Sequence, residues 1–427
     1  MPEHPVPRSV LVLGAGLAGL RTVAELRARG FSGEVTVVGT ETVPPYDRPP
    51  LSKELFARTE PRWLSDDGLG DLTELADRVV LGHRAVAMRA GESWAEVDVE
   101  AVETGTGAGA GAATYRADVV VLAVGAHAVA PSSWRGAVTL HRADDADRLR
   151  GLLRPGRRLV VVGAGWIGAE VSGLAAAQGC DVTVVEAAPA PLARQVGTAV
   201  GRHLVPWYAE AGVDLRCSTP VHDVRPGEVE LAGGEVLPAD VVLAATGVRP
   251  ATAWLEGSVP LTPGGAIPVD AAGRVTGAPP SVRAVGDCTD MTVAGLGTVP
   301  GGHWDAALTQ PAAVVAGLLG GEQPPTPAPY VFSTQFGRHL TLVGRSGDGA
   351  RVVYRGDPTG PAWTALFVED RPGSTVRLVA GFTADRPRDV GPLRRLLVGG
   401  ARPALDVEKA ADPAVPLKKA LAWRDRA

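Results

Sequence analysis

The chain has 427 residues and a formal net charge of −5, with 45% hydrophobic and 21% charged residues. This length predicts two or three domains, and an ordinary apolar content with a low net charge excludes a largely disordered chain. Domains that bind nucleic acid usually carry a basic excess, so the composition gives no indication of a nucleic-acid partner.

Three cysteines, Cys180, Cys217 and Cys288, lie far apart and form no CxxC pair. They indicate neither a disulfide scaffold nor a zinc site nor a redox-active dithiol, so we expect no bound metal. The first apolar run, residues 10–20, is too short to span a bilayer and lacks the flanks and cleavage site of a signal peptide. We therefore expect a cytoplasmic protein that does not associate with membranes.

A repeated pattern dominates the first half of the chain. Residues 9–26 and 159–175 each start with a continuous apolar run, which is typical of a parallel strand buried on both faces. A G-x-G-x-x-G turn, an amphipathic helix and a second apolar run follow each time. The glycines are Gly14, Gly16 and Gly19 in the first copy and Gly163, Gly165 and Gly168 in the second. The pattern predicts two βαβ units.

These turns predict two dinucleotide sites. The first glycine allows the tight turn, the second lets a pyrophosphate approach the backbone, and the third lets helix and strand pack closely. The helix that follows presents free N–H groups and a partial positive charge to the phosphates. The neighbouring residues in the two turns are Leu17, Ala18, Trp166 and Ile167. A packing turn without a nucleotide is the alternative for each copy.

Carboxylates near the ends of the second strands are candidates for ribose binding. Glu186 ends the strand of the second unit, where it can accept hydrogen bonds from a ribose 2′-OH and would repel a 2′-phosphate. This position favours NADH over NADPH, although a surface carboxylate is the alternative. In the first unit Glu41, 22 residues after Gly19, is the corresponding candidate.

The remaining elements are predicted in chain order from apolar runs and turn residues. The predicted strands are residues 118–124, 240–244 and 281–285, followed by 331–343, 351–354, 364–369 and 376–382; a helix covers 386–398. Residues 103–113 predict a loose hairpin loop and 323–329 a linker. Lys418, Lys419, Arg424 and Arg426 indicate a basic C-terminal surface segment, with a frayed tail as the alternative.

Seven motifs in this order resemble one family over nearly the whole chain. They are GAGLAG (14–19), YDRPPLSK (46–53), GAGWIGAE (163–170), ATGVRP (245–250), AVGD (284–287), HWDAALTQ (303–310) and YVFSTQFG (330–337). The set is similar to the FAD-dependent ferredoxin reductases of bacterial oxygenase systems. The resemblance implies FAD in the first site, NADH in the second, and electron transfer to a [2Fe–2S] ferredoxin or a related iron–sulfur carrier.

The resemblance also implies an α/β fold with two Rossmann-like domains, of the glutathione-reductase type, and a C-terminal α+β domain. The expected boundaries are 1–127 and 246–327 for the FAD domain, 128–245 for the NADH domain, and 328–427 for the last domain. The resemblance further implies that the carrier serves a cytochrome P450 or another oxygenase.

Site residues carry over where the motifs match. The resemblance places Arg48, Lys53, Asp287, Trp304 and Phe332 at the flavin, Glu170 near the nicotinamide, and Gly247 among the cofactor-binding residues. Lys53 and Glu170 are the candidate catalytic pair, because a cation near the flavin can stabilise charge on the reduced ring and a carboxylate can hold that cation. The alternative for Lys53 is an ordinary surface lysine, and for Trp304 a core aromatic.

Two departures from the family leave alternatives open. Residues 125–129 lack the usual arginines, and Phe332 and Thr334 replace a tryptophan and an aspartate. The alternatives are an NADH-dependent reductase of quinones or other small acceptors, and a flavin redox sensor resembling apoptosis-inducing factor. Disulfide reductases of this architecture need a cysteine pair near the flavin, and peroxidases and water-forming oxidases usually need a cysteine after the first βαβ unit, but no cysteine precedes Cys180.

Overall fold

The computed structural model describes residues 6–102, 111–346, 350–370 and 375–422. The chain forms two compact units, each built from three segments. Unit 1 contains Met1–Asp47, Arg62–His127 and Val248–Pro327, and unit 2 contains Arg48–Pro61, Ala128–Gly247 and Ala328–Ala427. Most of the loop expected at 103–113, together with Arg424 and Arg426 of the expected basic segment, lies outside the described residues.

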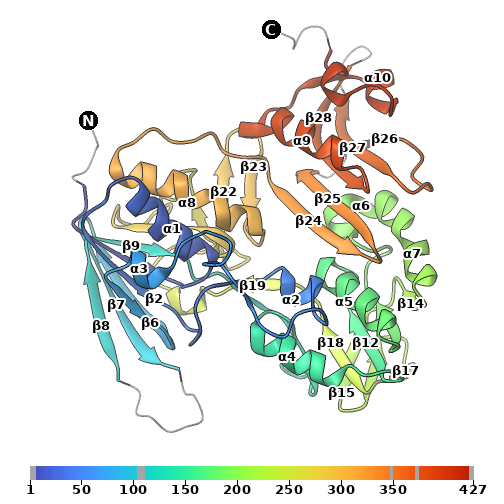
Figure 1. Cartoon of the computed structure of the whole chain (residues 1–427), viewed down its shortest axis with the longest axis horizontal. Coiled ribbons are helices and arrows are strands. Elements are labelled where there is room, and N and C mark those ends of the chain that lie inside the picture. Colours follow the sequence, from blue (N-terminus) through green and yellow to red (C-terminus); the bar gives the residue numbers. More distant parts are fainter. Residues whose placement is uncertain (1–5, 103–110, 347–349, 371–374, 423–427) are drawn as a thin grey trace. The chain divides into compact units, whose positions relative to one another are not determined.

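A five-stranded parallel sheet forms the centre of unit 1 (Figure 1). Its order is β21 (Val282–Ala284), β9 (Val119–Leu122), β1 (Ser9–Leu13), β2 (Glu34–Val38) and β5 (Arg78–Val80). β1 and β9 are almost wholly buried, as their continuous apolar sequences predict for strands covered on both faces. The apolar runs at 118–124 and 281–285 are thereby confirmed as strands.

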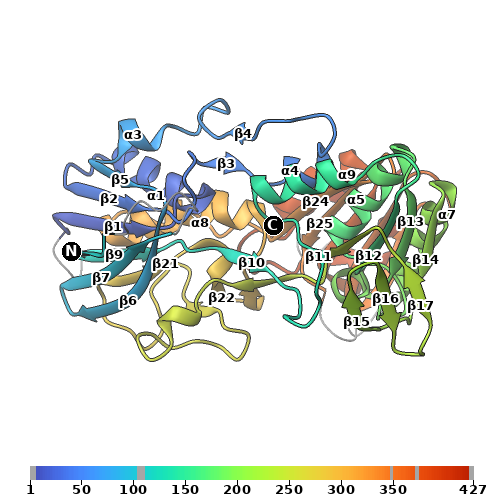
Figure 2. The same ribbon diagram turned by 90° about the horizontal axis from the view of Figure 1, so that it is seen from below.

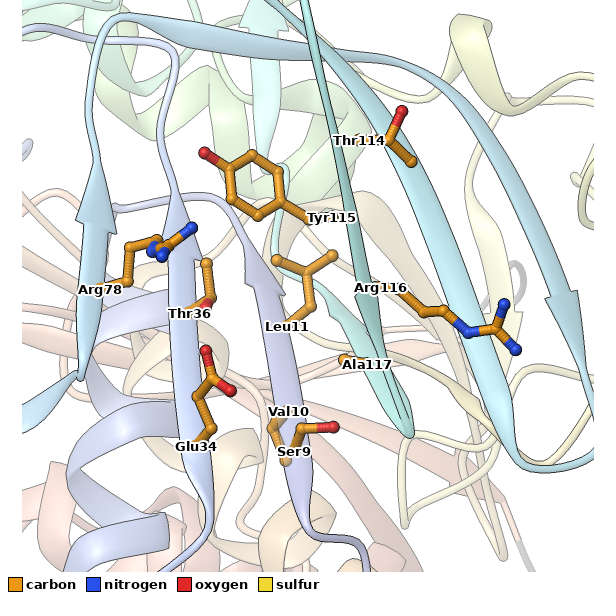
Figure 3. Close-up of a pocket in the computed structure, with 10 residues that line it drawn as sticks. All are labelled: Ser9, Val10, Leu11, Glu34, Thr36, Arg78, Thr114, Tyr115, Arg116 and Ala117. Carbon is orange, nitrogen blue, oxygen red and sulfur yellow. The ribbon is translucent and has the colours of Figure 1, made fainter.

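Two layers cover this sheet. Helices α1 (Leu17–Ala28) and α8 (Trp304–Leu319) pack side by side, and their apolar residues join Val10, Val12 and Val121 in one core cluster. The antiparallel strands β6 (His83–Gly91), β7 (Trp94–Ala101) and β8 (Ala113–Ala117) lie over the opposite face (Figure 1 and Figure 2). Side chains of β8 line a pocket together with residues of β1, β2 and β5 (Figure 3). Unit 1 also contains β3 (Tyr46–Asp47), β4 (Arg62–Trp63), α3 (Leu72–Leu75), β19 (Val248–Pro250), β20 (Ile267–Val269), β22 (Thr289–Val293) and β23 (Gly297–Pro300).

Unit 2 repeats this arrangement. Its parallel sheet has the order β11 (Ala137–Val138), β18 (Val241–Ala244), β12 (Arg158–Val162), β13 (Asp181–Val185) and β14 (Val213–Arg216). One face packs with α4 (Ala143–Leu152) and α5 (Trp166–Ala177), and the other packs with β15 (Val221–Arg225), β16 (Glu228–Leu231) and β17 (Val236–Pro238). The unit also contains α2 (Pro50–Lys53), α6 (Ala193–Gly201) and α7 (Val205–Glu210). The repeated sequence is therefore a repeated fold.

The C-terminal part of unit 2 is a second, antiparallel sheet. Its strands run in the order β24 (Tyr330–Gln335), β25 (Arg338–Gly344), β28 (Thr375–Ala384), β27 (Trp363–Asp370) and β26 (Arg351–Arg355), and β29 (Ala404–Asp406) pairs with β28. Helices α9 (Pro387–Leu396) and α10 (Val407–Ala411) share an apolar cluster with one face. The predicted helix over 386–398 is confirmed.

The prediction of one strand pattern over residues 331–343 is wrong, because the segment is a hairpin. β24 and β25 pair directly through a two-residue turn at Phe336 and Gly337, which have φ angles of 52° and 75°. Left-handed backbone at both positions suits a tight hairpin turn. Alternating side chains continue on either side of this turn, so the pattern reads as a single strand.

Within the described part of the chain, no helix is both long and apolar enough to cross a membrane. The same residues contain no group of three or more His, Cys, Asp or Glu side chains placed to hold a metal ion.

Candidate dinucleotide sites and the Lys53 cluster

Packing explains the glycines of the first turn. Gly14 has a φ of +118°, and a Cβ there would lie 2.0 Å from the carbonyl oxygen of Ala123. A Cβ on Gly19 would lie 1.8 Å from the carbonyl oxygen of Gly14. A Cβ on Gly16 would instead meet nothing within 4 Å, directly before the first residue of α1. The turn therefore leaves open space in front of a helix N-terminus.

The second turn has the same geometry. Gly163 has a φ of +108°, and its Cβ would lie 2.5 Å from the carbonyl oxygen of Ala245. A Cβ on Gly168 would approach the carbonyl oxygen of Gly163 to 2.1 Å, whereas one on Gly165 would meet nothing within 4 Å. Each glycine turn and the helix N-terminus that follows it are together called a cradle below. Each cradle presents backbone N–H groups and the positive end of a 12-residue helix, α1 or α5, to open space. These features fit the pyrophosphate of a dinucleotide.

Backbone groups hold the carboxylate of Glu186 beside the second turn. Its Oε2 accepts a hydrogen bond from Ala164 N, and its Oε1 accepts one from Ala188 N, both at 2.7 Å. Glu41 in unit 1 accepts a hydrogen bond of 2.6 Å from the hydroxyl of Tyr46. Both carboxylates are thus oriented by neighbours, and Glu186 directly adjoins the glycine turn expected to hold NADH.

The loop after β21 reaches the N-terminal end of α1. Gly286 has a φ of +81°, and a Cβ there would lie 2.9 Å from Cβ of Ala18. Asp287 follows, and its Oδ1 accepts a hydrogen bond of 3.2 Å from Gly302 N. Burial lowers the pKa of His303, opposed by the negative charge of Asp287. The structure therefore brings Asp287 close to the first glycine turn, with a neutral imidazole favoured nearby.

Trp304 meets the first two residues of the YDRPPLSK motif, Tyr46 and Asp47, within unit 1. The indole Nε1 donates a hydrogen bond of 2.6 Å to Oδ1 of Asp47, and the ring of Tyr46 packs edge-on against Trp63, 6.4 Å between centroids. The sequence assigned no function to Tyr46 or Asp47, although both lie in a motif used to establish the resemblance. Asp47 fixes the orientation of the half-buried Trp304.

Lys53 belongs to a buried polar cluster in unit 2. Its Nζ lies 2.7 Å from Oε1 of Glu170, a carboxylate whose side chain is 1% exposed. Ser52 Oγ donates to Oε2 and Ser333 Oγ to Oε1, both at 2.5 Å. Lys53 Nζ also lies 5.1 Å from the centroid of the Phe332 ring. The lysine is ion-paired and partly buried, rather than an ordinary surface lysine.

Sequence reasoning anticipated the pairing of Lys53 with Glu170 through the resemblance but missed two residues of strand β24. Ser333 donates to Glu170 and accepts a hydrogen bond of 3.1 Å from Nε2 of Gln335. Both lie in the YVFSTQFG motif. The sequence signal for these two residues is that polar side chains occupy alternate positions of a strand otherwise rich in aromatic and aliphatic residues.

The other candidates lie in several different places. Arg48 donates to the carbonyl oxygen of His141 at 2.6 Å, and Gly247 has a φ of +106° with open space beyond its Cα. Leu17, Trp166 and Ile167 are half-buried against neighbouring core clusters. Unit 1 contains the first glycine turn, Glu41, Asp287 and Trp304, and unit 2 contains the second glycine turn, Glu186, Arg48, Lys53, Glu170 and Phe332.

All three cysteines are free thiols. Burial raises the pKa of Cys288 to about 12, and burial also raises the pKa values of Cys180 and Cys217. These thiols therefore remain protonated at neutral pH, whereas disulfide exchange requires a thiolate.

Family comparisons agree with this architecture. Residues 8–310 match the model of the pyridine nucleotide-disulphide oxidoreductases, and residues 330–421 match the reductase C-terminal model. The chain belongs to the pyridine nucleotide-disulphide oxidoreductase family. The fold class expected from the sequence is confirmed, and the chain is a flavoenzyme of a family that uses FAD and NAD(H).

Individual relatives narrow the resemblance within the pyridine nucleotide-disulphide oxidoreductases. The ferredoxin–NAD(+) reductase component of the anthranilate 1,2-dioxygenase system of Burkholderia cepacia is 32% identical, covering 96% of this chain and 98% of the relative. The crystal structure of Fdr9 is 35% identical, with a TM-score of 0.83 and coverage of 96% and 99%. Putidaredoxin reductase, in its covalent complex with putidaredoxin, is 26% identical, with a TM-score of 0.81 and coverage of 96% and 97%.

Proposed function

We propose that this chain is an NADH-dependent ferredoxin reductase, which takes electrons from NADH through FAD and passes them to a [2Fe–2S] ferredoxin or a related carrier serving an oxygenase. The observation that carries the proposal is the pair of open glycine turns in one chain whose three cysteines are buried or half-buried free thiols. The relatives named as ferredoxin–NAD(+) reductases and the complex with putidaredoxin support the choice of an iron–sulfur acceptor.

We assign one cofactor to each cradle. We assign FAD to the turn Gly14–Gly19, with Glu41 at the ribose and Asp287 and Trp304 at the flavin, because these residues share unit 1. NADH is assigned to the turn Gly163–Gly168. When bound, the cofactors supply the hydride and single-electron chemistry, while the protein supplies binding and orientation.

Glu186 supports NADH over NADPH. Its carboxylate is held beside the second turn by Ala164 N and Ala188 N, where a ribose 2′-phosphate would add a second negative charge. Lys53 supplies a cation held by Glu170, and Phe332 lies against that cation. We assign Lys53, Glu170 and Phe332 to the surroundings of the flavin and nicotinamide rings. Arg48 and Gly247 are assigned to the same surroundings.

We further propose three functional domains: an FAD domain of residues 1–127 and 246–327, an NADH domain of 128–245, and a C-terminal domain of 328–427. Separate parallel sheets and core clusters support the first two, while residues 48–61 pack with the core of unit 2. The low cysteine content supports a cytoplasmic setting.

The deciding experiment is NADH-driven reduction of cytochrome c by the FAD-loaded protein, with and without a panel of [2Fe–2S] ferredoxins and a rubredoxin. We expect NADH to bleach the flavin anaerobically and one carrier to accelerate cytochrome c reduction strongly. A preparation that binds no FAD, or a bound flavin that NADH does not reduce, would contradict the proposal. Bleaching without acceleration by any carrier would instead favour a quinone reductase or a sensor.

A further inference from the structure

The buried carboxylate of Glu170 accepts hydrogen bonds from two serine hydroxyls in addition to its ion pair with Lys53. Ser333 and Lys53 both reach Oε1, at 2.5 and 2.7 Å, and Ser52 reaches Oε2 at 2.5 Å. An unpaired buried charge is strongly destabilising, so a carboxylate with 1% exposure needs such donors. The Lys53 side chain is 19% exposed and is the part of the cluster that reaches the surface.

The hydrogen bonds from strand β24 have a fixed direction. Nε2 of Gln335 can only donate, so the Ser333 oxygen accepts from it and the single hydroxyl proton is left for Glu170. Gln335 and Ser333 are only 1% and 2% exposed. The two side chains therefore form a buried chain of hydrogen bonds, from Gln335 to Ser333 to Glu170, which ends on the carboxylate paired with Lys53. This chain is called the relay below; no proton transfer is implied.

The hairpin turn anchors this strand on the helix that carries Glu170. A Cβ on Gly173 would lie 2.9 Å from Cδ1 of Phe336, so the ring occupies the space that a larger residue would fill. Gly173 lies three residues after Glu170 and therefore on the same face of α5. The Phe336 ring also packs on Tyr208, 4.5 Å between centroids. The C-terminal sheet thus holds β24 against the helix face that carries Glu170.

We propose that Ser333 and Gln335 are positioning residues for electron transfer from NADH: they orient the Glu170 carboxylate and thereby hold the Lys53 ammonium against the face of Phe332. This inference rests on the proposed function. Neither residue is assigned a contact with a cofactor. A cation held in one place stabilises developing charge without reorganising, whereas a lysine released from its partner regains rotamer freedom.

The first test observes Lys53 directly. The chain contains only four lysines, at positions 53, 409, 418 and 419, so a lysine-selective ¹³C spectrum is simple, and Lys53→Arg assigns the signal. We expect the Phe332 ring to displace the Lys53 side-chain signal. Ser333→Ala and Gln335→Leu should each move it toward the other three. Ser281→Ala is the matched control, because Ser281 is also buried but donates to Gly91 O at 2.6 Å.

The second test separates binding from the chemical step in the FAD-loaded protein. In stopped-flow reduction by NADH, Ser333→Ala should lower the limiting rate about tenfold, which is about 1.4 kcal/mol, and leave the NADH dissociation constant within about twofold. In a Lys53→Met background the same change should have no further effect, because the relay acts through Lys53.

An unmoved Lys53 signal in both variants would overturn the inference, as would effects of Ser333→Ala and Lys53→Met that multiply. If Ser333→Ala does not fold, Gln335→Leu tests the same relay one step away. A wild-type protein that NADH does not reduce would contradict the proposed function, while the spectrum would still decide whether the relay positions Lys53.

Discussion

Single carboxylates in this protein are oriented by donors that lie close to them. Glu186 accepts from two backbone N–H groups, and Glu170 accepts from two hydroxyls and an ammonium. Such charge-assisted hydrogen bonds are stronger than neutral ones. The position of each carboxylate charge is therefore fixed without a bound ligand. Replacement of either carboxylate should affect the group that it faces, the coenzyme at Glu186 and Lys53 at Glu170.

Coenzyme choice should respond to the charge at Glu186. Glu186→Arg removes repulsion toward a 2′-phosphate and adds a cation, so the ratio of kcat/KM for NADPH to that for NADH should rise at least about tenfold. Steady-state kinetics with both coenzymes measures the ratio. Glu210→Arg, the same change at an exposed position of α7, is the control. An unchanged ratio in Glu186→Arg would reject the ribose assignment.

Acid sensitivity should depend in part on Asp240. Side-chain and backbone hydrogen bonds from Arg158 lower the pKa of Asp240 to about 2. The folded pKa lies below the unfolded value of about 3.9, so this contribution is present above about pH 4 and is lost as the pH falls toward 2. The difference in urea midpoint between wild type and Asp240→Asn should therefore narrow between pH 5 and about pH 3. A difference that is independent of pH would contradict this linkage.

At the scale of elements, the two strand–turn–helix units show which glycines serve packing and which serve a ligand. The first and third glycine of each turn face backbone atoms at 1.8 to 2.5 Å from an added Cβ. The middle glycines, Gly16 and Gly165, face open space with φ angles of −85° and −77°, which any residue adopts. Substitution of a middle glycine should leave the fold intact and affect only ligand binding.

The pair Gly16→Asp and Gly165→Asp tests this division. The added carboxylate should repel the pyrophosphate in each cradle, so Gly16→Asp should purify without flavin. Gly165→Asp should retain flavin but lose its reduction by NADH. The flavin-to-protein absorbance ratio and anaerobic NADH titration measure the two effects, and each variant is the control for the other. Loss of flavin in both variants would contradict the separate assignment.

A buried ion network joins strand β26 to helix α9. Arg355 and Arg386 both donate to Oδ2 of Asp389, at 3.0 and 2.9 Å, and all three side chains are at most 6% exposed. Asp389→Ala would leave two buried cations without their carboxylate, and we expect a loss of about 3–5 kcal/mol in the free energy of unfolding. Asp370→Ala, which removes an exposed ion pair with Arg351, should change urea unfolding little. Equal effects of the two changes would contradict this account.

At the scale of the whole molecule, each unit has its own sheet and its own core clusters, and each contains one cradle. A ligand that binds only the folded state stabilises it in proportion to the logarithm of its concentration over the dissociation constant. The two cofactors should therefore stabilise the protein through different units.

Addition of FAD to flavin-free protein should raise its stability by about 2.7 kcal/mol when FAD is at about 100 times its dissociation constant. The Gly16→Asp protein should show no such shift but should still be stabilised by NAD⁺. Thermal unfolding monitored by tryptophan fluorescence measures both responses. Stabilisation of Gly16→Asp by FAD would show that FAD binds elsewhere.

Much of the fold is readable from the sequence because its signals are local. The apolar runs at 10–13 and 159–162 and the glycine spacing that follows each specify a buried strand, a tight turn and a helix within about 20 residues. The hairpin at Phe336 and Gly337 was missed, because its turn lacks the Asn-Gly or Asp-Gly signal and its strands alternate in the same way on both sides.

The two βαβ units, the glycine turns and the carboxylate beside the second turn can be predicted from the amino-acid sequence, since each depends on residues close together in the chain. Which buried polar groups share a partner follows instead from the packing of distant elements. Lys53, Glu170 and Ser333 come from α2, α5 and β24, more than 100 residues apart in sequence. Burial obliges each of them to find a donor or acceptor, but the choice of partner depends on how distant elements pack.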